Sequence, residues 1–442
     1  MKVDPANRPK TTPLQKKVVG ILEHNTRFKL HNELHMGPCE LLEAPTHVSH
    51  FALLIDDDET RHEHRMITQL CEHYSVTPPP EDVTHFTVKL GTFRFKWERH
   101  TEFSNYTFFI EAPFDTPFLA NAIDQVPSSW LEGLPGEVIA ATHIAIESNE
   151  RPHRSLDELA HLFTANTLMG AEVTAGAAIV WTDNKIHADG FGRILIHDVD
   201  LRARQAGRMV QRLIEIETYR MLAMRPVSMA RKYIPILAGF DERLAELTSN
   251  NSALDCLEDE RKLLDDITHL AAEIERISAQ TTSRFNASLA YHHIVKQRVT
   301  RLRENRIQGL QMFHEFMDQR LTGSIQTCSS VQKHLETLSN HVSRASSLLR
   351  TRVEISMEEQ SRDLLQSMDN RVKLQLRLQE TVEGLSVVVL SYYLLGIVGY
   401  GLKGLKSAGI PLNVELSIGI AIPVVVGAVF YSMRRMRKVL KH

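Results

Sequence analysis

Two long runs without charged side chains lie near the C-terminus. Residues 385–402 read LSVVVLSYYLLGIVGYGL, and residues 416–433 read LSIGIAIPVVVGAVFYSM. Eighteen helical residues span about 27 Å, close to the ~30 Å hydrocarbon core of a bilayer. Between the runs, Gly404, Gly409 and Pro411 favour a turn. The pattern predicts a two-helix transmembrane hairpin, and the alternative is a pair of buried core helices.

The region before the hairpin is rich in charge and poor in helix breakers. It contains no proline from residue 236 to residue 410, and apolar residues recur there at three- and four-residue steps. Such a sequence favours long helices. The repeat is not a strict heptad, so we expect a helical stalk or bundle with breaks near Thr281 and Gly323. The last helix should run from about Gln326 into the membrane.

The first 240 residues show shorter apolar segments, which predict strands separated by turns. Asp189-Gly190 is a turn pair that favours a hairpin. A helix is expected over about 201–224, and a short one from Pro13 to Leu22. Several hairpins and few crossovers indicate a mainly antiparallel sheet with packed helices, hence an α+β fold. The predicted strands are Val48–Ile55, Phe86–Phe95, Tyr106–Ile110, Val138–Ile146, Val173–Trp181 and Phe191–Ile196.

These patterns divide the chain into four parts. We expect a cytoplasmic α+β domain over 1–240, a stalk over 241–383, a transmembrane hairpin over 384–433 and a basic tail over 434–442. Lysine and arginine favour the cytoplasmic side of short membrane flanks. The tail carries five basic residues and the loop carries only Lys403 and Lys406, so both termini are predicted to be cytoplasmic. No signal-peptide pattern precedes the domain.

Composition excludes several functional classes. The 442 residues carry 51 lysines and arginines against 54 acids, a net charge of −3, which argues against nucleic acid as a partner. The four cysteines form no CxxC pair, so a zinc ribbon or a disulfide scaffold is not expected. No phosphate-binding loop, dinucleotide fingerprint or nucleophile elbow is present. We therefore expect neither a cofactor nor an enzymatic activity.

Two clusters invite comparison between a binding site and a structural role. His31, Glu33 and His35 form HNELH, whose histidines lie four apart, but the glutamate is misplaced for a metalloprotease, so we favour a hydrogen-bonded surface role over a metal. The segment WERHTEF over 97–103 concentrates ionisable groups between two strands. It is either a ligand or partner site or a polar network that fixes the hairpins. Its candidate residues are Glu98, Arg99, His100 and Glu102.

The same two readings apply to Asp183, Asp189 and Arg193. Basic residues recur over 296–306, where contact with phosphate or lipid competes with a solvated helix face. That run comprises Lys296, Arg298, Arg301, Arg303 and Arg306.

Polar and small residues repeat along the first apolar run. Ser386, Tyr393 and Tyr400 follow seven-residue steps on one helix face, with Gly396 between them. The stripe either lines a pore or packs helices together through small and polar residues.

The chain resembles a bacterial family of predicted membrane-anchored proteins of unknown function. The resemblance rests on HNELH, WERHTEF, the segment AGRMVQRLIEIETYRMLAM over 206–224 and the SYY triplet over 391–393. It spans nearly the whole chain and implies a bacterial membrane protein. With the hairpin and its basic flanks, this predicts a multi-pass protein of the bacterial cytoplasmic (inner) membrane. It brings no known activity and no catalytic residue.

The architecture is also similar to that of the CorA-type magnesium channels, which are pentamers with both termini inside. Their first membrane helix ends in Tyr-Gly-Met-Asn, and the asparagine helps select the hydrated ion. Here the matching place reads Tyr400-Gly401-Leu402-Lys403. A lysine at the mouth repels divalent cations, so the resemblance extends to the build and not to magnesium selectivity.

The sequence therefore supports two functional hypotheses. In the first, a membrane-anchored regulatory or scaffolding protein oligomerises through its stalk. Its partners are the lipid bilayer, further copies of the chain, and a cytoplasmic protein or small ligand. In the alternative, the chain forms an oligomeric CorA-like channel or transporter whose first membrane helix lines the pore.

Overall fold

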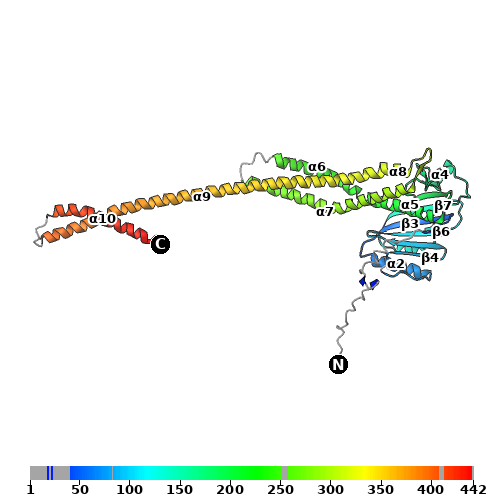
Figure 1. Ribbon diagram of the computed structural model, residues 1–442, viewed down its shortest axis with the longest axis horizontal. Coiled ribbons are helices and arrows are strands. Elements are labelled where there is room, and N and C mark those ends of the chain that lie inside the picture. Colours follow the sequence, from blue (N-terminus) through cyan, green and yellow to red (C-terminus); the bar gives the residue numbers. More distant parts are fainter. Residues whose placement is uncertain are drawn as a thin grey trace, which may run out of the picture. The chain divides into compact units, whose positions relative to one another are not determined.

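The computed structural model describes residues 17–18, 21–22, 40–407 and 413–440, except for residues 82 and 250–256. The chain divides into two compact units. The first comprises Met1–Ala245 and His269–Val342, and the second comprises Glu246–Thr268 and Ser343–His442. The fold is α+β, with a mixed sheet in the first unit and long helices after it (Figure 1). The four-part division expected from the sequence stays a prediction.

A nine-stranded sheet organises the first unit, in the order β11-β8-β9-β10-β7-β3-β6-β5-β4. Only the pair formed by β10 and β7 is parallel, so the sheet is mainly antiparallel, as predicted. The strands are β3 (Thr46–Leu54), β4 (His85–Leu90), β5 (Phe93–Arg99), β6 (Phe103–Glu111), β7 (Glu137–Glu147), β8 (Met169–Val173), β9 (Ala178–Thr182), β10 (Gly192–Asp198) and β11 (Asn305–Arg306).

Two predicted strands are each two strands joined by a tight turn. The segment 86–95 forms the end of β4 and the start of β5, and Gly91 turns between them with φ +58°. The segment 173–181 is split by Thr174 and Ala175, which take φ values of +56° and +63°. Gly176 in the same turn takes a φ of +86°, so the sequence did carry one signal for this break, which the strand prediction passed over. The hairpin at Asp189-Gly190 is confirmed, because β9 and β10 pair antiparallel around it.

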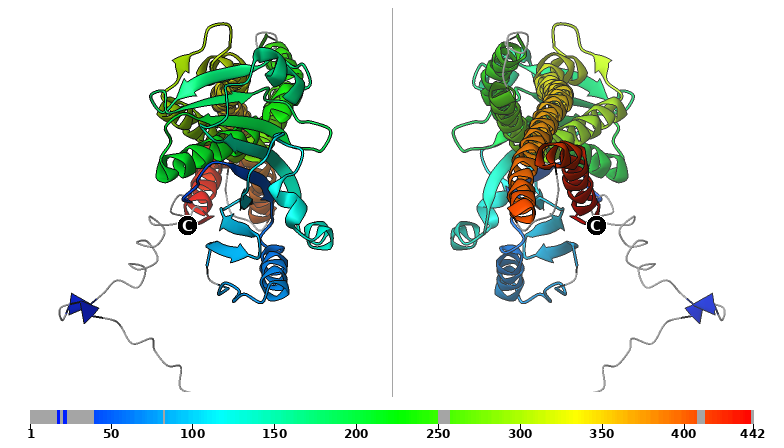
Figure 2. Two further views of the ribbon diagram at one scale, coloured as in Figure 1. Left: turned by 90° about the vertical axis from the view of Figure 1, so that its right-hand side faces the viewer. Right: turned by 90° about the vertical axis from the view of Figure 1, so that its left-hand side faces the viewer.

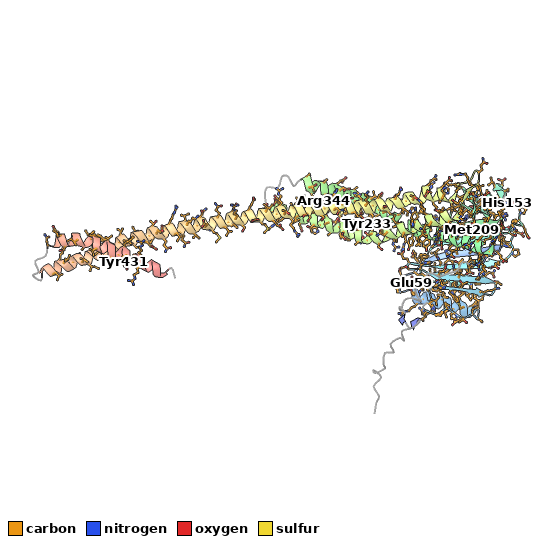
Figure 3. The ribbon with its side chains drawn as sticks, viewed as in Figure 1. Glu59, His153, Met209, Tyr233, Arg344 and Tyr431 are labelled. Carbon is orange, nitrogen blue, oxygen red and sulfur yellow. The ribbon has the colours of Figure 1, made fainter. Side chains whose placement is uncertain are left out.

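Helices cover both faces of the sheet (Figure 2). The predicted helix α5 (Ala203–Met224) packs on one face, where Met209, labelled in Figure 3, is fully buried. Gly207 permits its close approach, since an added Cβ would lie 1.7 Å from the Glu40 carbonyl oxygen. The other face is covered by α2 (Thr60–His73), η1 (Ala122–Gln125), α3 (Ser128–Glu132) and α4 (Leu156–Leu162).

The predicted helix break near Thr281 is wrong. Helix α7 runs from Leu257 to Leu302 without interruption. The hydroxyl of Thr281 donates to the carbonyl of Ile277 at 2.8 Å, and that of Thr282 donates to the carbonyl of Ser278 at 2.7 Å. These bonds satisfy the polar side chains inside the helix. Before it, α6 spans Val227–Ser249.

The expected break near Gly323 is also not a break. A short helix α8 (Phe313–Phe316) leads into the π-helical segment η3 (Met317–Thr322), which continues directly into α9 (Gly323–Ser407). The expected helix from Pro13 to Leu22 is wrong for its described residues, since β1 (Lys17–Val18) pairs antiparallel with β2 (Ile21–Leu22). The HNELH segment lies outside the described residues.

In the second unit, α10 (Val414–Leu440) follows α9. Two helices, Phe313–Leu405 and Glu415–Arg435, are long and apolar enough to cross a membrane by length and composition. Their most apolar 18-residue windows are each only 6% buried. Ser391 of α9 and Val429 of α10 are among the few buried side chains in these segments.

Candidate functional site

Strand alternation divides the WERHTEF segment between the two faces of the sheet. Trp97 and Arg99 lie on the face covered by α2, whereas Glu98 and His100 lie beside α5. Side chains of a strand point alternately to opposite faces, so neighbouring charged residues are separated. The four candidate residues therefore do not form one site.

Arg99 belongs to a buried network around Glu63 of α2, which the sequence did not single out. The carboxylate of Glu63 is fully buried. It accepts hydrogen bonds from Trp97 Nε1 at 2.7 Å, from Tyr106 Oη at 2.7 Å and from Arg99 Nε at 3.0 Å. Burial, followed by the Glu63 charge, raises the pKa of Tyr106. The charge of Glu63 is paired with Arg99 and both of its carboxylate oxygens accept hydrogen bonds, so Glu63 connects α2 to the sheet.

Glu102 is committed to a different contact. Its carboxylate pairs with Arg284 of α7 at 2.6 Å. This pair fastens the turn between β5 and β6 to the helical part of the same unit.

Glu98 and His100 do line a cavity, which lies between α5 and strands β5 and β6. We call it the α5 cavity. Its free volume is about 40 Å³, enough for a few water molecules. Lys96 pairs with Glu98 at 2.8 Å and donates to Gln211 Oε1 at 3.1 Å, and across the cavity Glu215 pairs with Arg298. Its main charges are therefore already paired.

The pKa values of two histidines are lowered here: His100 lines the cavity, and His50 lies behind the lining residues Thr107 and Thr218. His50 is fully buried and bonds the hydroxyls of Thr107 at 2.9 Å and Thr218 at 3.2 Å. Burial, followed by the charge of Lys96, lowers the pKa of His50 to about 3. Burial also lowers the pKa of His100. The α5 cavity can hold water or a small neutral polar group, and it presents neither a free charge nor a nucleophile.

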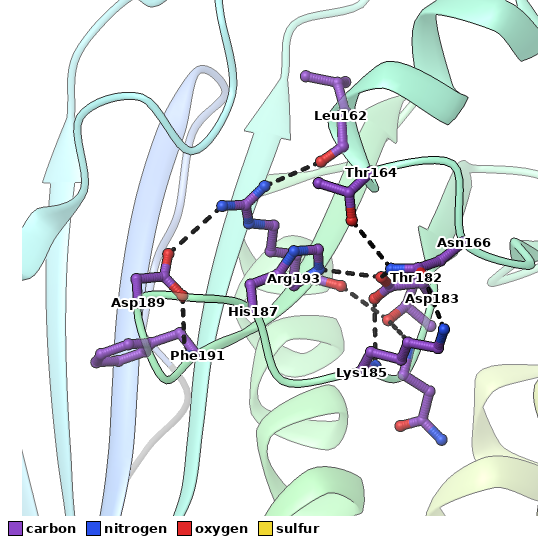
Figure 4. A network of polar contacts seen from close by, with 11 residues as sticks. Leu162, Thr164, Asn166, Thr182, Asp183, Lys185, His187, Asp189, Phe191 and Arg193 are labelled. Carbon is purple, nitrogen blue, oxygen red and sulfur yellow. Dashed lines mark hydrogen bonds and ion pairs between the residues drawn. The ribbon is translucent and has the colours of Figure 1, made fainter.

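Asp183, Asp189 and Arg193 fix the loop between β9 and β10 (Figure 4). Asp183 Oδ2 accepts from Asn166 Nδ2 at 2.7 Å and lies 3.0 Å from His187 Nε2. Asp189 accepts from the Phe191 amide at 3.0 Å. Arg193 donates to the carbonyl of Leu162 at 3.0 Å and lies 3.5 Å from Asp189. The dense bonding supports the structural role for this loop.

A serine–histidine pair that the sequence did not indicate lies inside the sheet. Ser49 and His143 face each other on β3 and β7, with Oγ and Nδ1 2.9 Å apart. Ser49 is 0% and His143 2% exposed, and burial lowers the pKa of His143 to about 4. A nucleophile needs substrate access, so this pair is part of the core. Among the described residues, no three histidine, cysteine or acidic side chains gather to hold a metal.

The polar and small residues predicted to line one face of the first membrane helix are mostly exposed on α9. Tyr393 is 67% and Tyr400 79% exposed, and Gly396 is exposed as well. Ser386 is half-buried, and its hydroxyl donates to the Val382 carbonyl at 2.8 Å. Lys403 is exposed, and the side chain of Lys406 lies outside the described residues. Whether the stripe lines a pore stays a prediction.

Comparison with known proteins gives one family. Residues 22–440 match the model described as "Protein of unknown function (DUF3422)". No curated protein matches the chain. A solved structure described as "structure of the full-length CmaX protein" is 12% identical and covers 67% of this chain and 89% of its own, with a TM-score of 0.15. A TM-score this low carries no conclusion about fold or function.

Proposed function

This chain belongs to the DUF3422 family of proteins of unknown function, and from that premise we propose that it is a membrane-anchored regulatory or scaffolding protein. Its N-terminal α+β domain works in the bacterial cytoplasm, and α9 and α10 anchor it in the inner membrane. The observation that carries the proposal is that α9 and α10 each contain an apolar stretch of 18 residues of which only 6% is buried. Apolar surface of this extent is stable only in lipid or against another protein.

The orientation follows from the basic residues. Arg434 and Arg435 are exposed at the end of α10, and three further basic residues follow them in the sequence. Between the two apolar runs the sequence has only two basic residues, Lys403 and Lys406, and both lie at the end of α9 and not in the loop expected from the sequence. This difference favours cytoplasmic termini.

Reporter fusions at His442 and Gly409 test this arrangement. The proposal requires a cytoplasmic signal at His442 and a periplasmic signal at Gly409. The full chain should also fractionate with membranes and resist extraction at high salt. A periplasmic signal at His442, or a soluble full chain, contradicts the anchor.

The stalk supports self-association. Along α9, between its contacts with α7 and its apolar window, large apolar side chains are exposed: Leu364 by 63%, Met368 by 61% and Leu376 by 56%. A second copy of α9 is a natural partner, because an isolated helix leaves such a stripe in water. Light scattering of the detergent-solubilised chain should show an oligomer, and Leu364→Glu with Met368→Glu should reduce its mass. A wild-type monomer contradicts self-association.

A channel is the second candidate, and the exposure of Tyr393 and Tyr400 favours it. An oligomer could place this stripe around a lumen. In that case Lys403→Asn removes one positive charge per subunit and should raise divalent-cation flux into reconstituted vesicles, by about tenfold or more if the charges form a ring. Vesicles that conduct nothing with either protein support the anchor alone.

A further inference from the structure

A groove in the first unit lies between α7 and the π-helical segment η3, which we call the η3 groove. Its volume is about 310 Å³, at the lower end of the range of roughly 300–1,000 Å³ that small-molecule sites occupy. π-Helical turns are rare and are frequent at functional sites. The feature therefore combines a cavity of suitable size with an unusual backbone in one wall.

The floor of the η3 groove is apolar and its rims are polar. Four buried side chains form the floor, two from each wall: Val295, Val299, Met317 and Leu321. Along the α7 rim, His292, Lys296 and Thr300 follow four-residue steps. This layering suits a ligand with an apolar body and charged ends.

A hydrogen bond closes each end of the groove, one between α7 and η3 and one between the connection after α7 and helix α8. At one end, His292 Nε2 and Thr322 Oγ1 are 3.2 Å apart. At the other, His314 Nδ1 lies 3.0 Å from Glu304 Oε2. Glu304 also accepts from the amides of Phe313 at 3.0 Å and His314 at 3.1 Å. Its carboxylate is thus used by the start of α8 and is not available to a ligand.

Two opposite charges remain between these ends. Lys296 lies on the α7 wall and Asp318 on the η3 wall, and both side chains are exposed. Within the part of the chain that the structure describes, neither side chain forms an ion pair. Both charges act on His292, whose pKa is lowered by burial first, then lowered by Lys296 and raised by Asp318. The groove therefore presents one cation and one anion above an apolar floor.

We propose that the η3 groove binds a small zwitterion with an apolar side chain, the chemistry of a free apolar α-amino acid. Lys296 receives the ligand carboxylate, Asp318 receives the ammonium, and the side chain lies over Val299 and Met317. A ligand with one charge leaves either the lysine or the aspartate without a partner. The inference does not depend on membrane anchoring, since every residue it uses lies in the first unit.

Calorimetric titration of the full chain in detergent with L-leucine tests the proposal. N-acetyl-leucine lacks the ammonium and leucinamide lacks the carboxylate, so both should bind at least about tenfold more weakly, as expected for losing a charged hydrogen bond. Absence of L-leucine binding at ~10 mM, or equal binding of all three compounds, overturns the proposal. A groove that holds only water molecules would show no binding of L-leucine.

Matched variants locate the site. Lys296→Gln and Asp318→Asn keep side-chain size and should each weaken L-leucine binding about tenfold, whereas Lys333→Gln, an exposed lysine on α9 outside the groove, should not. The double variant Lys296→Asp with Asp318→Lys should bind L-leucine more tightly than Lys296→Asp alone or Asp318→Lys alone, because the zwitterion can bind in the reverse orientation. Unchanged binding in both single variants assigns the ligand to another place and overturns the proposal.

Discussion

The α5 cavity and the η3 groove are built from the same residue types and differ in whether the charges have partners. In the α5 cavity, Lys96 pairs with Glu98, and Arg298 of α7 pairs with Glu215. In the η3 groove, Lys296 stands two residues before Arg298 on the same helix and forms no ion pair among the described residues. Charges paired within the protein hold elements together, whereas charges without partners above an apolar floor are free to bind a ligand.

The largest effect should come from the buried Glu63 network. Glu63→Ala leaves the Arg99 guanidinium and two further donors without their acceptor, so we expect a loss of about 3–5 kcal/mol in the free energy of unfolding. All three tryptophans, Trp97, Trp130 and Trp181, lie in the first unit, so their fluorescence during urea unfolding reports on that unit. The double variant Glu63→Leu with Arg99→Met should recover part of the loss. A change below about 1 kcal/mol for Glu63→Ala would show that the network is not structural.

Lys96→Met should have a smaller effect at the α5 cavity. The Lys96 side chain is 5% exposed and Glu98 is 17% exposed, so the change leaves a largely buried carboxylate without its cation. We expect a loss of about 2–3 kcal/mol in the same urea measurement. Adding Glu98→Gln removes the uncompensated charge and should restore stability in part. If the double variant is the less stable protein, the pair is not the source of the effect.

His50 should make the first unit less stable in acid. Its pKa is about 3 in the folded protein and about 6.5 in an unfolded chain, so between these values the unfolded state binds more protons. Its contribution is therefore complete above pH 6.5 and is lost as the pH falls toward 3. From pH 7 to pH 5 this amounts to about 2 kcal/mol. His50→Gln should flatten the pH dependence of the urea midpoint, and an unchanged slope would refute the assignment.

The smallest effect on stability belongs to the η3 groove. Lys296→Gln and Asp318→Asn remove exposed charges that make no ion pair within the described residues, so each should change the free energy of unfolding by less than about 0.5 kcal/mol. Tryptophan fluorescence in urea measures this directly. A loss above about 1 kcal/mol would place these residues in the structural class and remove the contrast between the two regions.

The sequence predicted the periodic elements and the hairpin turn at Asp189-Gly190, but it missed other turns and the contacts between distant residues. Strand β7 lies where a short apolar segment predicted a buried strand, and helix α5 lies where apolar residues on one side predicted a helix. The turn over Thr174 and Ala175 was missed because small and apolar residues continue through it, although Gly176 there has a φ of +86° and is a turn residue. The break predicted at Thr281 is wrong because a run of polar residues is compatible with a loop as well as with a helix. In the structure the Thr281 hydroxyl bonds the carbonyl of Ile277 in the preceding turn, so the helix continues.

The candidate sites show the same limit. Glu98 and Arg99 are neighbours in sequence, but the strand sends them to opposite faces, so a cluster of charges in sequence was not a cluster in space. Lys296 belonged to a basic run noted in the sequence, while Asp318 carried no signal. Lys296 and Asp318 line the same groove because the connection between α7 and α8 reverses the chain and brings η3 beside α7. The sequence pattern did not show which helices would lie side by side.

Segment η3 also sets the rotational phase of the side chains that follow it at the start of α9, in the same unit. Four-residue steps in an α-helix drift by about 40° each, yet Phe313, Met317, Leu321 and Ile325 follow such steps and are all buried. The wider π turn absorbs this drift, because it takes more residues to complete a revolution. Removing a single residue from η3 would leave an ordinary α-helical turn there, and Leu321 and Ile325 would still be able to pack on the same side as Phe313. Segment η3 thus keeps one buried face continuous from α8 into the start of α9, within the unit that holds the sheet.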